Sequence, residues 1–318
     1  MQLKTWISAL RLRTLPLATA SITMGTLAAG VLGESSRSIF WFALATAISL
    51  QILSNLANDY GDFIKGTDNA ARLGNQRAMQ SGHIAPLQMK MAIALFVGIS
   101  LVLGVNLLYE ASANHWEWVT WLFFIVGLLA IAAALKYTMG KNPYGYSGLG
   151  DVFVFLFFGP VAVAGTFILH QQFIWNWSDD WPVILAAVAL GLLSTAVLNT
   201  NNIRDIANDQ ASGKITIPVR IGLKNARLYH LTITLTACIL MILFTMIVYP
   251  VYMLWSALGM VPILLQVKKV MLEEPSPAYN ALLKQLSLGI LGWVIAYVVV
   301  GSFHDLFVIS NIIHTYGN

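Results

Sequence analysis

Residues 38–68 read SIFWFALATAISLQILSNLANDYGDFIKGTD. From residue 38 to residue 58 this stretch contains no Lys, Arg, Asp or Glu, and a helix needs roughly 20 apolar residues to cross a bilayer. Three aspartates, Asp59, Asp62 and Asp68, follow at once. The stretch therefore predicts a membrane-spanning helix that leads directly into an acidic segment.

The composition of the whole chain favours a membrane protein. Of its 318 residues, 58% are hydrophobic and 10% are charged, whereas a soluble domain carries about 25% charged residues. Such a chain has too few polar groups to cover its surface in water. The single cysteine, Cys238, excludes an internal disulfide framework.

Several other stretches without Lys, Arg, Asp or Glu are long enough to span a bilayer. Together with the first they cover residues 14–33, 38–58, 91–109, 118–135, 152–178, 181–203, 228–267 and 285–303. The stretch 228–267 has twice the needed length and contains Tyr249 and Pro250 at its middle, which suits a turn at the membrane surface. None alternates as a barrel strand does. We therefore expect an all-α, multi-pass transmembrane helical bundle of about nine spans, forming one integral membrane domain over residues 1–318.

The distribution of Lys and Arg predicts how the bundle is oriented. With nine spans and the N-terminus in the cytoplasm, every basic residue except Arg37 falls on the cytoplasmic side. Membrane proteins carry an excess of Lys and Arg in their cytoplasmic loops. We therefore expect the N-terminus and the acidic segment to face the cytoplasm, and the C-terminus to lie on the other side of the membrane.

A second polar segment, NTNNIRDIANDQASGK at residues 199–214, follows the sixth expected span. Its Asn201 and Asp205 match Asn58 and Asp62, so the chain contains two weakly repeated halves. If each span continues as a helix, polar side chains share one face of each helix. These side chains are Asn55, Asp59 and Asp62 in the first segment, and Asn202, Asp205 and Asp209 in the second. Packing of the two halves against each other would bring both faces to one cavity.

Carboxylates that share a cavity stay ionised only if cations lie between them. Neither segment contains His or Cys, which argues against zinc, whereas oxygen ligands suit Mg²⁺. Mg²⁺ completes its coordination with water and phosphate, and Arg and Lys bind phosphate well. The basic residues nearby are Lys65, Arg72, Arg77, Arg204 and Lys214. The pattern predicts a magnesium-dependent diphosphate site, and the missing GxxxxGK[ST] loop argues against a nucleoside triphosphate.

Two other interpretations account for the same residues. Asp and Asn beyond a helix end can simply cap it, and Lys or Arg at a membrane surface can contact anionic lipid. Acidic residues repeated in two halves also occur in cation-coupled transporters. A transporter site lies near the middle of the membrane, whereas both acidic segments here lie at the ends of spans. Chemistry on a diphosphate is therefore the favoured interpretation.

The two segments resemble the aspartate-rich motifs of the UbiA superfamily of membrane prenyltransferases. Those motifs are NDxxD with a third Asp, and DxxxD with a downstream Lys. This sequence has Asn58, Asp59 and Asp62 with Asp68, and Asp205 and Asp209 with Lys214. The third Asp comes two residues later than in the commonest form. That spacing, together with ILSNLANDYGD, NPYGYSGLGD and NNIRDIANDQASGKITIPVRIG, is most similar to the menaquinone-pathway branch.

The resemblance implies a reaction, a cofactor and a location. A polyprenyl group would pass from a polyprenyl diphosphate to 1,4-dihydroxy-2-naphthoate, with release of pyrophosphate and CO₂. Mg²⁺ would be held by the aspartates of both motifs, namely Asp59, Asp62, Asp68, Asp205 and Asp209. The enzyme would lie in the bacterial cytoplasmic membrane, in contact with lipid, without nucleic acid and without an obligatory protein partner. Other acceptors, 4-hydroxybenzoate or haem, stay open as alternatives.

The resemblance also implies roles for individual residues. Catalysis would involve Asp62, Asp205, Lys214 and Arg204, and the leaving diphosphate would be neutralised by Lys214, Arg204 and Arg77. Substrate binding would involve Asn55, Asn58, Asn202, Lys65, Arg77, Tyr137 and Tyr144. Lys136 or Lys141 would meet the carboxylate of the acceptor.

Overall fold

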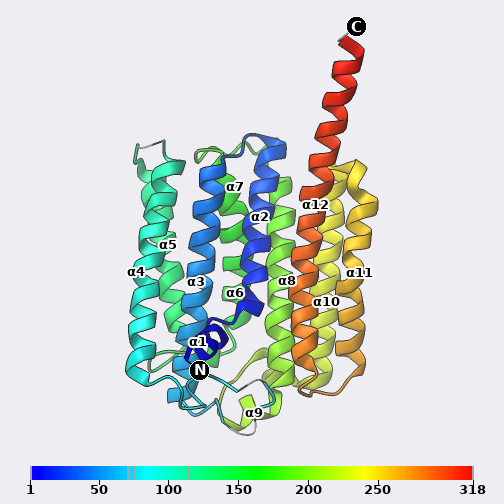
Figure 1. Cartoon of the computed structure of the whole chain (residues 1–318). Helices are drawn as coiled ribbons and strands as arrows, with labels where there is room; N and C mark the ends of the chain where they lie inside the picture. Colours follow the sequence, from blue (N-terminus) through cyan, green and yellow to red (C-terminus); the bar gives the residue numbers. More distant parts are fainter. Residues whose placement is uncertain (1, 70–71, 75, 114, 317–318) are drawn as a thin grey trace.

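The computed structural model describes residues 2–69, 72–74, 76–113 and 115–316 and is all-α. Its helices run side by side in one bundle, with the N-terminus and the two acidic segments at one end and the C-terminus at the other (Figure 1). Within the described residues, nine helices are long and apolar enough to cross a membrane. The predicted fold class and the count of nine spans are confirmed.

The helices follow the predicted apolar stretches closely. Near the N-terminus lie α1 (Gln2–Leu10), the 3₁₀ turn η1 (Leu12–Thr14), α2 (Leu15–Leu32), α3 (Arg37–Ile64), α4 (Pro86–Ala111) and α5 (Trp118–Lys136). The middle contains η2 (Tyr144–Tyr146), α6 (Gly150–Leu156), the π-helical η3 (Phe157–Ala164), α7 (Gly165–His170), α8 (Pro182–Arg204) and α9 (Ile206–Ala211). The last part contains α10 (Ile217–Val248), η4 (Pro250–Tyr252), α11 (Met253–Leu272) and α12 (Tyr279–Tyr316). The predicted turn at Pro250 separates α10 from α11, as expected.

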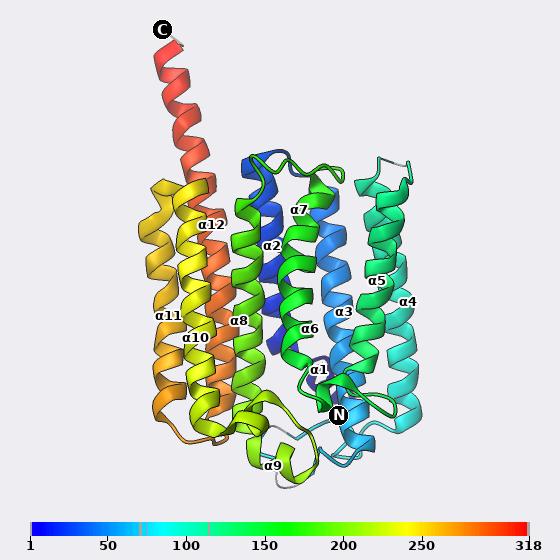
Figure 2. The ribbon, with the colours of Figure 1, turned by 180° about the vertical axis from the view of Figure 1, so that it is seen from behind.

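Helix α8 is the buried centre of the bundle. It packs against α10 and α12 on one side and against η3 and α6 on the other, and Figure 2 shows it between these two groups. Most of its apolar side chains, among them Leu190 and Leu193, are fully buried. A helix that is apolar on all sides and buried on most of them suits the interior of a membrane bundle.

Close backbone contacts fix η3 between α2 and α8. A Cβ atom on Gly159 of η3 would overlap the carbonyl oxygen of Ala187 on α8, and one on Gly25 of α2 would overlap that of Val163 on η3. Small residues let membrane helices approach in this way. The π-helical turn coincides with Pro160, which has no N–H to donate inside a helix.

The second acidic segment differs from the expected helical continuation. The first segment does continue α3 to Ile64, but α8 ends at Arg204 and a separate short helix, α9, begins at Ile206. Asp205 between them has φ −97° and ψ 11°, outside helical geometry. Asn202, Asp205 and Asp209 therefore do not form one helical face, and that expectation was wrong.

The common position of the two acidic segments can be tested by cysteine labelling. In a Cys238→Ala background we expect His83→Cys and Gln210→Cys, both exposed at the acidic end of the bundle, to react with an impermeant maleimide only from the cytoplasmic side. Ser178→Cys, exposed in the loop before α8 at the other end, should react only from outside. Labelling of His83→Cys and Gln210→Cys from opposite sides would contradict the arrangement.

Candidate active site

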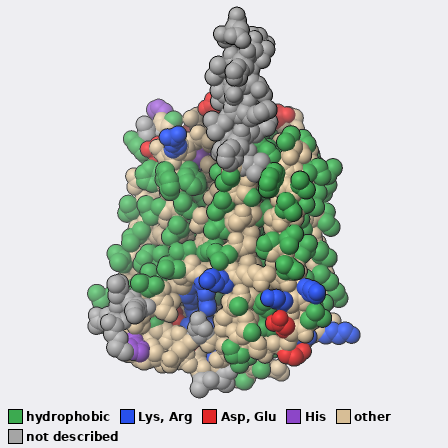
Figure 3. Space-filling view, turned by 45° about the vertical axis from the view of Figure 1, so that its right-hand side comes forward, with side chains coloured by type: hydrophobic (Ala, Val, Ile, Leu, Met, Phe, Trp, Pro, Cys, Tyr) green, Lys and Arg blue, Asp and Glu red, His purple; other side chains and the backbone are tan. Residues whose placement is uncertain are grey.

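A cavity of about 580 Å³ lies between α2, α3, α4, α5, the α6–η3–α7 span and α8. Its polar end lies at the acidic end of the bundle, where Figure 3 shows Lys and Arg side chains gathered in a hollow. Its walls are apolar along most of their length. Along α3 the lining runs from Asp62 to Ala43, which corresponds to roughly 28 Å of helix at 1.5 Å per residue.

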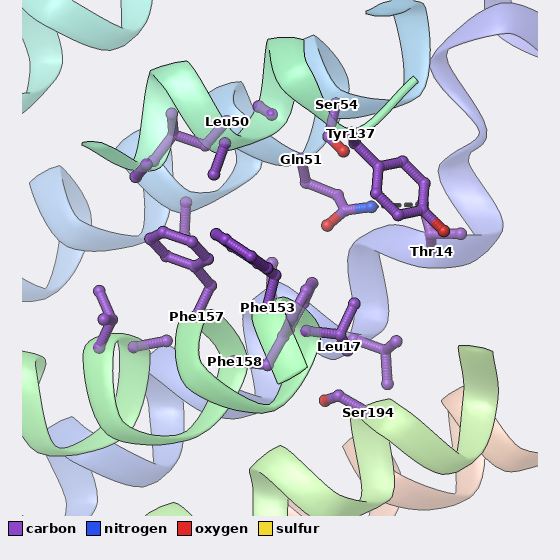
Figure 4. A pocket seen from close by; sticks show the side chains of 18 of the residues that line it. Thr14, Leu17, Leu50, Gln51, Ser54, Tyr137, Phe153, Phe157, Phe158 and Ser194 are labelled. Carbon is purple, nitrogen blue, oxygen red and sulfur yellow. Dashed lines mark hydrogen bonds between the residues drawn. The ribbon is translucent and has the colours of Figure 1, made fainter. Parts of the chain in front are cut away.

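Figure 4 shows how the walls are built near the middle of the cavity. Helix α3 contributes Leu50, Gln51 and Ser54, and the facing side carries phenylalanines from α6 and η3. The polar end is different, because charged and amide side chains line it. They are Arg11, Arg13, Asn55, Asn58, Asp62, Arg72, Arg77, Asn201, Asp205, Asp209 and Lys214. A cavity with apolar walls and one charged end fits a long apolar molecule that has one anionic end.

Asp62 is positioned from three elements. Tyr146 of η2 donates a hydrogen bond to its Oδ1 at 2.9 Å, and the Lys214 ammonium lies 3.7 Å from its Oδ2. In the amide orientation that satisfies both neighbours, Asn58 donates to Asp62 Oδ2 at 2.7 Å and accepts from Arg11 Nη1 at 2.9 Å. Asp62 is only 2% exposed, so these contacts stabilise its charge in place of water.

Asp205 is held by a different kind of contact. Arg204 donates to both of its carboxylate oxygens, at 2.9 Å and 2.5 Å. The same guanidinium donates to Asn201 Oδ1 and to Asn280 Oδ1 of α12. Bidentate pairs of this kind are strong and fix the direction of the carboxylate. Arg204 thus orients Asp205 and is itself held by α12.

Two cations connect the motifs across the cavity. The Arg72 guanidinium lies 3.5 Å from Asp68 of the first motif and 3.3 Å from Asp205 of the second. Lys214 of the second motif lies 3.7 Å from Asp62 of the first, and Asn208 donates to the Thr67 carbonyl oxygen at 3.0 Å. The motifs are separated by more than a hundred residues in the chain but form one site.

Similar helix ends place the two segments that follow the motifs. Gly66 ends the turn after α3 with φ 72°, and Gly213 ends the turn after α9 with φ 71°. The next N–H groups return to the helices, from Thr67 to the Asp62 carbonyl oxygen and from Lys214 to that of Asp209. This is the Schellman geometry, which favours glycine at the left-handed position. The local sequence therefore turns Lys214 back towards the carboxylates.

Asp59 and Asp68 lie behind the main cavity, next to its arginines. Arg77 lies 3.7 Å from Asp59 and 3.5 Å from Asp68, and Arg11 lies 3.9 Å from Asp59. All four carboxylate oxygens are buried, and none has a hydrogen-bond partner among the described groups. Buried carboxylates that lack close hydrogen-bond donors are unfavourable, and the arginine nitrogens stay 3.5–3.9 Å away, so these oxygens are suited to an additional cation.

The carboxylates of the two motifs fit Mg²⁺ better than a metal held by protein side chains alone. Within the described part of the chain, no group of three His, Cys, Asp or Glu side chains is close enough to hold a metal alone. Mg²⁺ does not need such a cage, because it is held by one or two carboxylates with water and substrate phosphate. The unpartnered oxygens of Asp59 and Asp68, and the cavity-lining carboxylates of Asp62, Asp205 and Asp209, fit that requirement.

Burial changes the pKa values of groups in the two loops. It raises the pKa of Asp68 to about 7, with a further contribution from the Asp62 carboxylate. It also raises the pKa of Asp209 to about 7, although Lys214 acts in the opposite direction. For Lys214 burial alone would lower the pKa, but the carboxylates of Asp62 and Asp209 outweigh it and raise it. Lys214 is therefore a permanent cation.

Aromatic rings line the cavity next to the charged groups. The ring centroids of Tyr137 and Tyr144 are 5.4 Å apart, those of Tyr144 and Phe153 are 4.0 Å apart, and Phe153 stacks towards Phe157 at 6.3 Å. All four rings belong to the cavity lining. The Tyr144 hydroxyl donates to the Ala133 carbonyl oxygen, which leaves its ring, and not its hydroxyl, facing the cavity. We call these four residues the aromatic row.

The structure brings many of the residues singled out in the sequence into one cavity lining. These are Asn55, Asn58, Asp62, Arg77, Tyr137, Tyr144, Asp205, Asp209 and Lys214. The others lie elsewhere. Asp59 and Asp68 contact the arginines behind the cavity, Arg204 is buried behind Asp205, and Lys65 is exposed above the Tyr146 ring. Asn202 is buried outside the lining, where its neighbour Asn201 appears instead. The predicted roles of all these residues stay predictions.

Four contributors to the site were not assigned roles from the sequence. Arg11 and Arg13 counted only as topology charges, yet both line the cavity. Tyr146 follows the two predicted tyrosine contacts, Tyr137 and Tyr144, in the sequence and donates to Asp62. Asn280 is far from both motifs and gave no signal, because its contact with Arg204 depends on the packing of α12 against α8. By contrast, Lys136 and Lys141 are exposed and lie outside the lining.

Known proteins resemble the chain over most of its length. The sequence pattern of the UbiA prenyltransferase family matches residues 18–304. The chain is 41% identical over 274 residues to the 1,4-dihydroxy-2-naphthoate octaprenyltransferase of Escherichia coli, covering 86% of each chain. It is 36% identical over 298 residues to the protein of the same name from Mycobacterium leprae, covering 92% of this chain and 94% of that one.

Solved structures share the fold at low sequence identity. The apo structure of a UbiA homolog from Aeropyrum pernix matches with a TM-score of 0.70 and 17% identity, covering 92% of this chain and 99% of that chain. A UbiA homolog from Archaeoglobus fulgidus, bound to DMAPP and Mg²⁺, matches with a TM-score of 0.59 and 16% identity, covering 95% and 99%. These matches support the helical architecture.

The raised pKa values of Asp68 and Asp209 predict how stability depends on pH in the metal-free protein. Each carboxyl has a pKa of about 7 when folded and about 3.9 when unfolded, so between these values only the folded state binds the proton. In EDTA the detergent melting temperature should therefore rise as the pH falls from about 7.5 to about 5. The double variant Asp68→Asn/Asp209→Asn should show a flatter profile. A wild-type profile that falls over this range would contradict the assignment.

Proposed function

The chain belongs to the UbiA prenyltransferase family, and we propose that it transfers a polyprenyl group from a polyprenyl diphosphate to 1,4-dihydroxy-2-naphthoate at the polar end of its cavity. The family resemblance found in the sequence is thereby confirmed. One observation supports the reaction most strongly. An apolar cavity, roughly as long as a membrane span along α3, ends at two joined aspartate motifs.

The polar end fits the diphosphate of the donor. Arg11, Arg72, Arg77 and Lys214 supply fixed positive charge there, and Asp62, Asp205 and Asp209 would hold Mg²⁺, with Asp59 and Asp68 behind them. Bound Mg²⁺ supplies positive charge to the diphosphate oxygens as the leaving group departs. Positive groups that are already in place where negative charge grows lower the barrier without reorganisation.

The aromatic row faces the reacting end of the donor. When the carbon–oxygen bond to the diphosphate breaks, an allylic cation forms next to Tyr137 and Tyr144. The electron-rich faces of aromatic rings attract cations, and the site excludes water that would otherwise capture the cation. The electron-rich acceptor ring then forms a carbon–carbon bond with it, and the ring carboxylate leaves as CO₂.

The membrane arrangement suits both substrates. A polyprenyl tail is as apolar as lipid and occupies the apolar part of the cavity, while the charged groups of donor and acceptor stay at the surface. We place the N-terminus and both motifs on the cytoplasmic side of a bacterial cytoplasmic membrane and the C-terminus outside. We expect lipid around the bundle and no obligatory protein partner in the reaction.

The reaction is tested with purified protein in detergent. We expect a prenylated, decarboxylated product and pyrophosphate from 1,4-dihydroxy-2-naphthoate, Mg²⁺ and a polyprenyl diphosphate, identified by mass. Excess EDTA should abolish turnover and added Mg²⁺ should restore it, because the carboxylates alone repel a diphosphate. If the protein prenylates 4-hydroxybenzoate or haem efficiently and the naphthoate does not react, the proposed acceptor is wrong. Cation movement without release of pyrophosphate would favour a transporter.

Replacement of single aspartates separates chemistry from folding. Asp62→Asn should lower the rate about 10²-fold or more, as for other single losses from a site that stabilises developing charge. It should lower the melting temperature only slightly, because the amide can still accept from Tyr146 and the Asp209 carboxylate still acts on Lys214. Asp205→Asn should be equally slow but less stable, since it leaves Arg204 buried without its carboxylate.

The exposed Asp179→Asn at the other end of the bundle is the matched control and should retain activity. The double variant Asp62→Asn/Asp205→Asn should be little slower than either single variant, because residues that act as one unit are not additive. A near-normal rate in Asp62→Asn would show that the acidic motifs do not carry the reaction.

A further inference from the structure

Arg13 differs from the other cations of the cavity. It lies on η1, the short turn between α1 and α2, is partly buried and belongs to the cavity lining. Its Nη1 lies 3.5 Å from Asn280 Oδ1, which already accepts from Arg204 at 2.8 Å. Among the side chains that the structure describes, no carboxylate lies within 4.0 Å of its guanidinium.

The other lining cations are all paired with a motif carboxylate. Arg11 lies near Asp59, Arg72 near Asp68 and Asp205, Arg77 near Asp59 and Asp68, and Lys214 near Asp62. Those pairs form the part of the cavity that suits Mg²⁺ and a diphosphate. An arginine that is partly buried without a strong partner is unfavourable unless an anion binds to it. Arg13 is therefore available for a second, separate anion.

The side of the cavity lining formed by α2, α8 and α12 suits a flat ring better than a phosphate. Leu17 follows Arg13 by one turn on α2, and α12 contributes Leu283 and Ser287 to the lining. On α8, Ser194 is 1% exposed, and its hydroxyl has no hydrogen-bond partner among the described groups. Figure 4 shows this hydroxyl pointing into the open space beside Leu17 and Phe158. Apolar surface that adjoins a cation without a carboxylate partner and carries one free hydroxyl is typical of a site for an aromatic acid.

We propose that Arg13 binds the carboxylate of the aromatic acceptor and that Ser194 hydrogen-bonds a ring hydroxyl. This inference rests on the proposed function and assigns its second substrate to the side formed by α2, α8 and α12. The reacting ring carbon must approach the donor carbon that carries the diphosphate, so the acceptor has to bind near the polar end. Arg13 lies there, whereas the exposed Lys136 and Lys141 do not line the cavity.

The bidentate geometry of Arg makes this contact selective. A guanidinium offers two parallel donors that match a carboxylate, whereas a Lys ammonium acts as a point charge. The charge-assisted contact should favour an acceptor with a carboxylate by about tenfold to a hundredfold over one without it. Arg13 is thus a specificity-determining residue that contacts substrate and takes no part in the release of the diphosphate.

The experiment compares two competitive inhibitors, 1-hydroxy-2-naphthoate and 1-naphthol, which differ only in the carboxylate. Wild-type protein should bind the carboxylate compound about tenfold or more tightly. Arg13→Gln should reduce this preference to near unity and raise KM for 1,4-dihydroxy-2-naphthoate about tenfold or more, while KM for the polyprenyl diphosphate stays within about threefold. Arg13→Lys should retain part of the preference. Ser194→Ala should weaken both inhibitors by a similar factor, because both carry the ring hydroxyl.

Exposed Arg37→Gln at the other end of the bundle is the matched control and should behave as wild type. Because the inhibitor ratio is measured within one variant, a general loss of folded protein does not change it. An unchanged ratio in Arg13→Gln, or a rise in KM for the polyprenyl diphosphate alone, would overturn the inference and assign Arg13 to the diphosphate. The proposed function fails separately, if wild-type protein forms no prenylated naphthoate by mass.

Discussion

Five buried carboxylates can share one end of an apolar bundle only because cations lie between them. Isolated, these charges would repel one another and would be costly to remove from water. Arg72 reaches from Asp68 to Asp205, and Lys214 reaches back to Asp62. These contacts hold α3 and the α8–α9 segment at a fixed distance, so the charge balance that permits the site also defines its shape.

The second constraint is the contrast between the two parts of the cavity. Lipid offers no hydrogen bonds, so ionisable groups of membrane helices gather where water or partners are available. Here they gather at one end, and the walls beyond Gln51 and Ser54 are mostly apolar up to Ala43. A substrate with a long apolar tail and an anionic head is therefore oriented before any specific contact forms. Orientation of this kind lowers the entropic part of the reaction barrier.

The sequence predicted the spans and the two motifs because both depend on local features. Span length follows from the thickness of the bilayer. Asp62 lies on the last turns of α3, and Lys214 returns to the cavity directly after the turn ended by Gly213. The sequence did not predict which side chains of the second motif face the cavity. On α8 it is Asn201, and not Asn202, that lines the cavity, and the helix breaks after Arg204. That break goes with the bidentate contact between Arg204 and Asp205, which spacing alone does not show.

Helix α12 contacts the second motif through the side chain of Asn280. Asn280 of α12 accepts from Arg204, and Arg204 in turn fixes both oxygens of Asp205. Because Asn280 donates its own amide to the Pro277 carbonyl oxygen, its oxygen can face only towards the arginines. The first turn of α12 therefore helps to set the direction of the Asp205 carboxylate between α8 and α9. A residue outside every recognisable motif thus determines whether Asp205 faces Arg72, and with it whether the two motifs act as one site.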